Sequence, residues 1–411
     1  MIVRRIHLAI ALVTLAAIGS LPIFAQNDSG TRLDIYGFAM LDMGYQTQQN
    51  DPAWFDVLRP TKLPSFEDEF GGDGETFAGV RQSRFGTKGF IPVKGGGEFT
   101  TIFEFELFGV GPDEGQTTFR LRHAYGEYKA FGAGQTWSPF MDPDVFPNSI
   151  EYWGPNGMVF FRNVQVRWMP LRGENAVTIA LERPGASGDP GVFVGAPELD
   201  DLSPRFPYPD LSAHYRMNRK WGHVQIAGIV REMRWDDADP NGPNFSGSAT
   251  GWGVNLSSNL KFGEDTLRLQ VVYGEGISNY MNDATADVGA TFDPNTGTGD
   301  PDIGEALPLL GIVAFYDHTW TERFTSSIGY SMVDIENSDA QDPTAYNRGR
   351  YALVNLLHHP FDGVMWGGEV QWGDRENFSA VPGDEEPFTS HDLRIQFSVK
   401  YNFSKSFGGT S

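Results

Sequence analysis

The chain has 411 residues, with 31 basic and 53 acidic side chains, a formal net charge of −22 and no cysteine. The lack of cysteine excludes disulfides, thiolate metal sites and cysteine nucleophiles. The acidic balance argues against a nucleic-acid partner, which requires a positive surface facing the phosphates. The 49 glycines and the 13% of aromatic residues favour strands over helices, because glycine weakens a helix and aromatic side chains pack well on a pleated surface.

Residues 1–25 have the pattern of a secretory signal peptide. Arg4 and Arg5 precede an apolar stretch over residues 8–18, and Gly19, Ser20, Pro22 and Ala25 follow it. This order predicts cleavage after Ala25. The apolar stretch is too short to span about 30 Å of hydrocarbon as a helix. Residues 26–411 are therefore predicted to form one exported domain.

The rest of the chain alternates between apolar and polar residues. The last segment shows the pattern best: positions 393, 395, 397, 399, 401 and 403 are apolar or aromatic, and the positions between them are polar. Such alternation is typical of a strand with one buried face. The run over residues 393–403 exceeds the five or six residues usual for soluble strands and matches the roughly 9–11 residues of a tilted membrane strand.

Sixteen such strands are predicted along the chain. In order they are 31–46, 77–91, 97–109, 118–131, 132–137, 158–169, 175–182, 210–218, 222–235, 250–261, 266–276, 308–320, 324–333, 348–357, 364–373 and 390–403. Short turns and long loops rich in Gly, Pro, Asp and Asn alternate between them. An even strand number, short periplasmic turns and long extracellular loops are typical of a transmembrane antiparallel β-barrel in the outer membrane of a Gram-negative bacterium.

Aromatic residues at the strand ends agree with this fold. They flank the predicted short turns at Trp168, Trp221, Trp320 and Phe324, and the long loops at Trp235, Tyr273, Tyr330 and Trp372. Rings with a polar edge favour the two membrane interfaces. The predicted surroundings are then outer-membrane lipid and lipopolysaccharide, and the barrel-assembly machinery is expected as a partner during biogenesis.

A membrane sheet has to close, because every backbone amide in hydrocarbon needs a partner within the protein. A barrel of sixteen strands is too wide for side chains to fill, so we expect a watery channel. One face of each strand would then lie against water. Arginine or lysine at the midplane of the outer face costs about 2–4 kcal/mol, and the strand faces that carry these residues are therefore predicted to point inward.

The charged inward faces between residues 81 and 129 suggest a constriction that selects solutes. The candidate residues on strands are Arg84, Lys88, Glu104, Glu106, Arg120, Arg122 and Arg167. The third loop, residues 138–157, adds Asp142, Asp144 and Glu151. We expect this loop to fold into the lumen, as it does in porins of sixteen strands, so that its acids face the arginines across the narrowest point. Arg81 and Arg162 do not fit the alternation, which leaves a rim position, a bulge or a subunit interface for them.

Other chemistry has little support in the sequence. Asp237, Asp239 and Asn241 resemble the start of a calcium loop, but Ser248 replaces the glutamate that an EF-hand requires. These residues are a weak candidate for a metal site and also suit an ordinary turn. No G-x-S-x-G, H-E-x-x-H or phosphate-binding motif occurs. We therefore expect neither catalysis nor a cofactor.

Four segments resemble the DcaP-like family of outer-membrane porins. They are RQSRFG at 81–86, RLRHAYGEY at 120–128, GQTWSPFMD at 134–142 and GPNGMVFFRNVQVRW at 154–168. The resemblance implies a homotrimer of sixteen-stranded barrels that takes up small anionic solutes, notably dicarboxylates and aromatic carboxylates. It also implies a basic lumen, carried here by Arg84, Arg120, Arg122 and Arg167.

The sequence therefore predicts a porin, a passive channel for small hydrophilic solutes with a preference for anionic carboxylates. Two alternatives remain open. One is a structural or adhesive outer-membrane barrel with an occluded lumen, and the other is a soluble secreted β protein. Single-channel conductance separates the first alternative from a porin, and heat-modifiable migration on a gel separates a barrel from the second.

Overall fold

The computed structural model describes residues 30–196, 199, 201–238, 244–293, 304–378 and 386–408. The predicted signal peptide, residues 1–25, lies outside the described residues. The strands are β1 (Arg32–Gln46), β2 (Glu75–Gly79), β3 (Arg84–Pro92), β4 (Glu98–Phe108), β5 (Thr117–Tyr128), β6 (Phe131–Trp137), β7 (Arg162–Leu171), β8 (Asn175–Glu182), β9 (Gly188–Asp189), β10 (Leu202–Arg205), β11 (Asp210–Arg219), β12 (Gly222–Asp237), β13 (Gly247–Phe262), β14 (Asp265–Glu275), β15 (Val288–Gly289), β16 (Glu305–Ala306), β17 (Pro308–Thr321), β18 (Phe324–Ile335), β19 (Tyr346–Phe361), β20 (Val364–Asn377) and β21 (Thr389–Gly408).

Helical structure in the described residues consists of short 3₁₀ turns. They are η1 (Pro52–Trp54), η2 (Pro60–Lys62), η3 (Gly111–Asp113), η4 (Pro143–Val145), η5 (Gly191–Phe193) and η7 (Ser278–Tyr280). Among the described residues, no helix has the length and apolar character needed to span a membrane.

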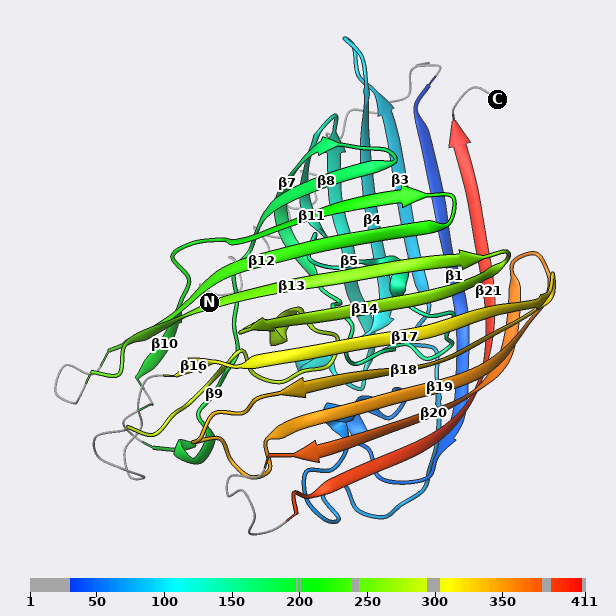
Figure 1. The fold of residues 1–411 in the computed structure, drawn as a ribbon. Helices are drawn as coiled ribbons and strands as arrows, with labels where there is room; N and C mark the ends of the chain where they lie inside the picture. The colour runs from blue at the N-terminus through cyan, green and yellow to red at the C-terminus, as the bar shows by residue number, and fades with distance from the viewer. Residues whose placement is uncertain are drawn as a thin grey trace, which may run out of the picture.

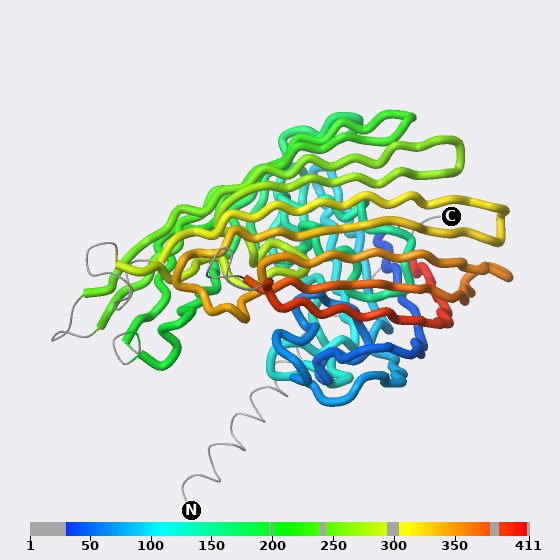
Figure 2. Tube along the Cα trace, turned by 60° about the horizontal axis from the view of Figure 1, so that its bottom comes forward, coloured from blue at the N-terminus to red at the C-terminus, as the bar shows by residue number. Residues whose placement is uncertain are grey.

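The main sheet closes into an antiparallel β-barrel of sixteen strands (Figure 1). The sheet has 18 strands, but β2 and β3 lie end to end along β1, and β10 and β11 lie end to end along β12. β21 pairs with β1 from Arg32↔Gly408 to Gln46↔Arg394, and the blue and red ends of the chain lie side by side in Figures 1 and 2. Closure leaves the barrel without a long open edge, which confirms the predicted fold class.

The two ends of the barrel differ as predicted. The hairpins β11–β12, β13–β14, β17–β18 and β19–β20 all turn tightly at the right of Figure 1. The long connections, which include residues 138–161 and 276–307, all leave from the other end. A tight hairpin needs two or three residues to reverse the chain, and the opposite end is free to carry longer loops.

The faces of the wall follow the alternation of the sequence. On β13, Val254 and Leu256 are 46% and 53% exposed on the outer face, whereas Asn255 and Ser257 are buried on the inner face. Six of the eight aromatic residues predicted at the rims, such as Trp168, are exposed, and Trp235 and Trp372 are half-buried. The outer face is therefore apolar with an aromatic border, as a lipid environment requires.

The interior is not wet on every side. Inward side chains of β12, β14 and β17–β19 pack with apolar loop residues into one core. The core contains Ile229, Val272, Leu309, Val313, Phe315, Val333, Ile335, Tyr351 and Leu353 from the wall, and Leu58, Phe140, Met158, Ile277 and Tyr280 from the loops. The expectation that one face of each strand lies against water is wrong for this half of the barrel. Loops cover these inward side chains, so burial between protein layers replaces hydration.

Several predicted strand boundaries also need correction, among them the following three. The predicted strand at 158–169 begins only at Arg162, because residues 158 and 159 belong to the apolar core. The last strand continues beyond residue 403 to Gly408, paired with β1. The strand at 77–91 is interrupted at residues 80–83, where Ser83 bonds the backbone of Met40.

Candidate functional site

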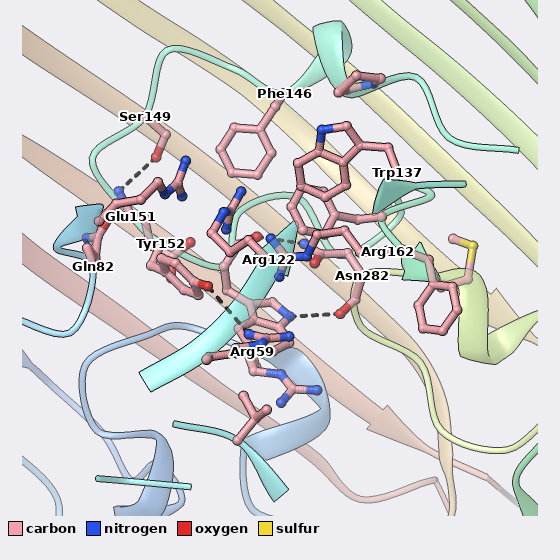
Figure 3. A pocket seen from close by; sticks show the side chains of 18 of the residues that line it. Arg59, Gln82, Arg122, Trp137, Phe146, Ser149, Glu151, Tyr152, Arg162 and Asn282 are labelled. Carbon is pink, nitrogen blue, oxygen red and sulfur yellow. Dashed lines mark hydrogen bonds between the residues drawn. The ribbon is translucent and has the colours of Figure 1, made fainter. Parts of the chain in front are cut away.

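A cavity of about 670 Å³ lies between three of the long loops and the wall formed by β1, β3, β5–β7, β20 and β21. Its lining is basic and aromatic, and Figure 3 shows part of it from close by. The basic residues are Arg59, Arg84, Arg120, Arg122, Arg162 and Lys400, and the aromatic ones include Trp54, Trp137, Phe146, Tyr152 and Trp153. Glu151 is the acidic residue among the lining side chains.

Behind the basic surface, two glutamates of β4 hold the arginines in place. Arg122 Nε lies 2.7 Å from Glu104 Oε1, and Arg122 Nη1 lies 2.5 Å from Glu106 Oε2. Glu106 is also within 3.4–3.7 Å of Arg84, Arg120 and Arg162. Four arginines therefore share two buried carboxylates, which leaves a net charge of +2 in this cluster at the cavity wall.

A β-bulge on β5 brings these side chains together. The register between β4 and β5 shifts after Glu104↔His123, so that Leu121 faces Phe105 and Arg120 faces Glu106. The extra residue in β5 allows Arg120, Arg122 and His123 all to approach the two glutamates. Strict alternation would not place His123 on the same side as Arg122.

The two arginines that did not fit the alternation both face the interior. Arg81 lies in the interruption between β2 and β3, where it pairs with Asp56 of the first long loop at 2.5 Å and bonds the Gly109 carbonyl. Arg162 begins β7 and lies 3.5 Å from Glu106. Arg81 therefore lies at a local break in the strand, which is not one of the three explanations that the sequence left open.

The third loop meets the arginine cluster through Tyr152. Its hydroxyl donates to Glu106, and Arg120 Nη1 lies 3.4 Å from the same hydroxyl. On its other side this loop contacts the opposite wall: Ser149 and the Ile150 amide donate to Glu369 of β20, and Asn148 accepts from Asn355 of β19. The loop thus contacts inward side chains on both sides of the barrel.

Glu151 lines the cavity but does not face the arginine cluster. Its carboxylate accepts hydrogen bonds from the Leu58 amide at 3.2 Å and from the Gly154 amide. Burial raises its pKa from 4.5 to about 7. It links the third loop to the first loop, so its position differs from the expected one opposite the arginines.

Asp142 and Asp144 of the third loop form a separate group with side chains of β11, β12 and β13. Asp142 accepts from His223 at 2.6 Å, from Ser257 at 2.7 Å and from Arg216 at 3.0 Å, and Arg216 also pairs with Asp144. Burial raises the pKa of Asp142, but the hydrogen bond and charge of His223 and the charge of Arg216 outweigh it and leave the pKa below its usual value. The Asp142, Asp144 and His223 ligand atoms are close enough for a metal ion, yet Arg216 already compensates both carboxylates.

Two other candidate residues lie outside this cavity. Arg167 donates to Gln165 and to the Trp137 carbonyl, and Lys88 lies 5.3 Å from the Tyr36 ring. Neither lines the cavity. Of the weak metal candidates, Asp239 and Asn241 lie outside the described residues, and Asp237 accepts from the Phe245 amide.

The sequence did not indicate Arg59, which projects into the cavity from the first long loop (Figure 3). Its guanidinium carbon lies 4.2 Å from the centroid of the Trp54 ring and 4.1 Å from that of the Trp153 ring, and these two rings contact each other edge to face. Asp283 pairs with it at 2.8 Å. No periodic pattern marks a residue in a loop, so only its neighbour Pro60, which often signals a turn, could have drawn attention to this segment.

The family model of the DcaP outer membrane protein matches residues 76–403. The chain belongs to this family. The match covers most of the barrel, so the protein is an outer-membrane channel of the porin type in a Gram-negative bacterium. No curated protein matches this sequence.

Solved structures show the same fold. The outer membrane channel DcaP of Acinetobacter baumannii superposes with a TM-score of 0.74 at 20% identity, covering 92% of this chain and 99% of that chain. An anion-selective porin from Comamonas acidovorans has a TM-score of 0.56 at 10% identity, covering 91% of this chain and all of that chain. OmpT of Vibrio cholerae in its trimer form has a TM-score of 0.55 at 12% identity, with 91% and 100% covered.

Proposed function

We propose that this porin is a passive channel for small hydrophilic solutes and prefers anionic carboxylates, including dicarboxylates. The observation that carries the proposal is the excess of arginine over carboxylate at the cavity: Arg84, Arg120, Arg122 and Arg162 share two glutamates. A positive ring in a narrow passage lowers the energy of an anion and raises that of a cation. The fold of the anion-selective porin from Comamonas acidovorans supports the proposal.

Arginine is suited to this task because its planar guanidinium binds a carboxylate through two parallel hydrogen bonds. Aromatic rings beside the arginines, such as Trp137 and Phe146, would contact the carbon skeleton of the solute. We further propose that the third loop narrows the lumen at this point. The electrostatic effect of the carboxylates on the other loops falls off over about 8 Å at physiological salt. These carboxylates would therefore influence ions at the mouth of the channel more than ions in the narrow passage.

The remaining parts of the proposal follow from the fold and from the sequence. Residues 1–25 direct export and are removed, and the mature barrel assembles as a homotrimer in contact with lipid and lipopolysaccharide. OmpT of Vibrio cholerae, which shares the fold, has a trimer form. The barrel-assembly machinery inserts the chain, because the unpaired edges of a sheet that has not yet closed are costly in hydrocarbon.

Reversal potentials in planar bilayers under a salt gradient test the selectivity. Arg120→Ala combined with Arg122→Ala should lower the ratio of anion to cation permeability, because it removes the net charge of +2. An unchanged reversal potential would exclude these arginines from the selectivity filter.

A barrel with an occluded lumen is the second candidate. The apolar core that fills the half of the interior along β12 and β17–β19 favours it. Single-channel recordings decide between the two: discrete current steps in salt solution require a continuous passage, whereas an occluded barrel inserts without conductance.

A further inference from the structure

Arg59 and Asp283 form an ion pair where three long loops meet at the cavity. Arg59 belongs to the first loop, Trp153 to the third loop, and Asp283 to the loop between β14 and β17. Arg59 Nε and Nη2 both bind Asp283 Oδ1, at 2.9 and 2.8 Å. The Trp153 indole donates to the Asn282 carbonyl at 2.8 Å, which brings the third loop against the same segment.

The guanidinium of Arg59 is accessible to a solute, and its partner is not. Arg59 keeps 11% of its side chain exposed and lines the cavity, whereas Asp283 is fully buried and does not line it. Trp54 and Trp153 lie on adjacent sides of the guanidinium, with their ring centroids 4.9 Å apart. The exposed part of the guanidinium faces the cavity, where its N–H groups can bind a carboxylate.

Arg59 is not the only hydrogen-bond donor to the Asp283 carboxylate. Its Oδ2 accepts from the Thr61 amide at 3.0 Å, and its Oδ1 accepts from the Thr61 hydroxyl at 2.5 Å. When Arg59 turns away, both carboxylate oxygens of Asp283 keep a donor. A buried carboxylate that keeps its hydrogen bonds avoids most of the free-energy penalty of an unpaired charge. Arg59 can therefore leave Asp283 for another carboxylate and return to it.

We propose that Arg59 is a carboxylate-exchange site, which releases Asp283 and binds the carboxylate of a solute entering the cavity. This inference rests on the proposed function, since it assigns a binding residue to the same passage. The solute would bind first to Arg59, where the loops meet, and then to the arginine cluster around Glu106. Cation–π contacts with Trp54 and Trp153 keep the guanidinium at the edge of the passage in either state.

Three variants test the exchange. Asp283→Asn keeps the shape and one acceptor but removes the competing charge, and Arg59→Gln removes the cation. Arg375→Gln is the matched control, because Arg375 donates to the carbonyls of Thr61 and Leu63 in the same first loop but does not line the cavity. Heat-modifiable migration verifies that each variant is folded.

The measurement is the association rate of succinate, taken from current interruptions in planar bilayers with chloride as the background anion. Asp283→Asn should raise this rate roughly tenfold, and Arg59→Gln should lower it roughly tenfold. A tenfold change is the effect expected from one charge-assisted hydrogen bond. Arg375→Gln should leave it unchanged. The uncharged probe succinamide should respond to none of the variants.

If the Asp283→Asn and Arg59→Gln channels conduct but both keep the wild-type association rate of succinate, the inference is overturned. The proposed function would still stand in that case. The same holds if Arg375→Gln matches Asp283→Asn, because a loosened loop would then explain the change. A wild-type protein that inserts into the bilayer without conductance would instead overturn the proposed function, and the inference with it.

Discussion

Glu106→Gln is the most informative single change in the arginine cluster. Glu106 is buried and lies within 4 Å of Arg84, Arg120, Arg122 and Arg162. Glutamine keeps the size of the side chain and one acceptor oxygen but removes the negative charge. The net charge of the cluster then rises from +2 to +3, with only Glu104 left as a counter-charge.

The size of the effect follows from Coulomb's law. A unit charge about 4 Å away changes the energy of a solute carboxylate by about 1 kcal/mol in water, and by more where the dielectric is lower. Since 1.4 kcal/mol is a factor of ten, the ratio of anion to cation permeability should rise by about fivefold or more. The barrel should also unfold at a lower temperature, because removing one partner of a buried ion pair costs about 3–5 kcal/mol.

Reversal potentials under a salt gradient measure the ratio, and the temperature of the gel shift measures stability. Glu369→Gln is the control: Glu369 is buried on β20, accepts from Ser149 and Ile150, and forms no ion pair within the described part of the chain. A ratio that stays constant or falls in Glu106→Gln would refute the role of the cluster. An equal rise in Glu369→Gln would show that the effect is not local.

Three further changes test the fold and the loops. Leu256 lies on the outer face at the middle of β13, and Leu256→Arg should lower the stability of the inserted barrel by about 2–4 kcal/mol. Thr250→Arg, near the rim, should lower it by about 0–1 kcal/mol. Equal folding yields of the two variants in lipid would contradict an outer face that contacts lipid. Gly157→Ala would place a Cβ 2.7 Å from the Ile312 carbonyl, so the third loop should shift and the single-channel conductance should change; an unaltered conductance would separate the loop from the passage. The pKa of Glu151 is raised from 4.5 to about 7, so the folded state holds a proton that the unfolded state releases, and stability should fall as pH rises between these values. Glu151→Gln should remove that part of the pH dependence of the gel-shift temperature, and an identical profile would contradict the assigned pKa.

The positions of the arginine cluster were partly predictable. Arg84, Glu104, Glu106 and Arg120 lie on adjacent strands with consistent alternation, so a sheet had to bring them to one face. Arg122, two positions from Arg120, was expected on the same face, whereas His123 reaches the cluster only through a β-bulge, which alternation does not reveal. A bulge depends on how two strands pair, and one strand read alone contains no information on the register of the other.

The loops were less predictable than the wall. Asp142 and Asp144 were expected opposite the arginine cluster, but they pair with Arg216 of β11. Arg59 was not noticed, although Asp283 and two tryptophans hold it at the cavity. Contacts between loops that are far apart in the chain arise only after closure, and local composition says little about which of them will meet.

The sequence by itself determined the order of the strands and the face that each one turns outward, because a lipid environment favours apolar side chains and requires a fully paired backbone. Only the tertiary structure decided how the interior is divided. The inward side chains of β17, such as Leu309 and Val313, are covered by loops and form a dry core, while those of β4 and β5 remain beside a basic cavity. Alternation separates the two faces of a strand, but whether water or a loop covers the inner face depends on residues more than a hundred positions away.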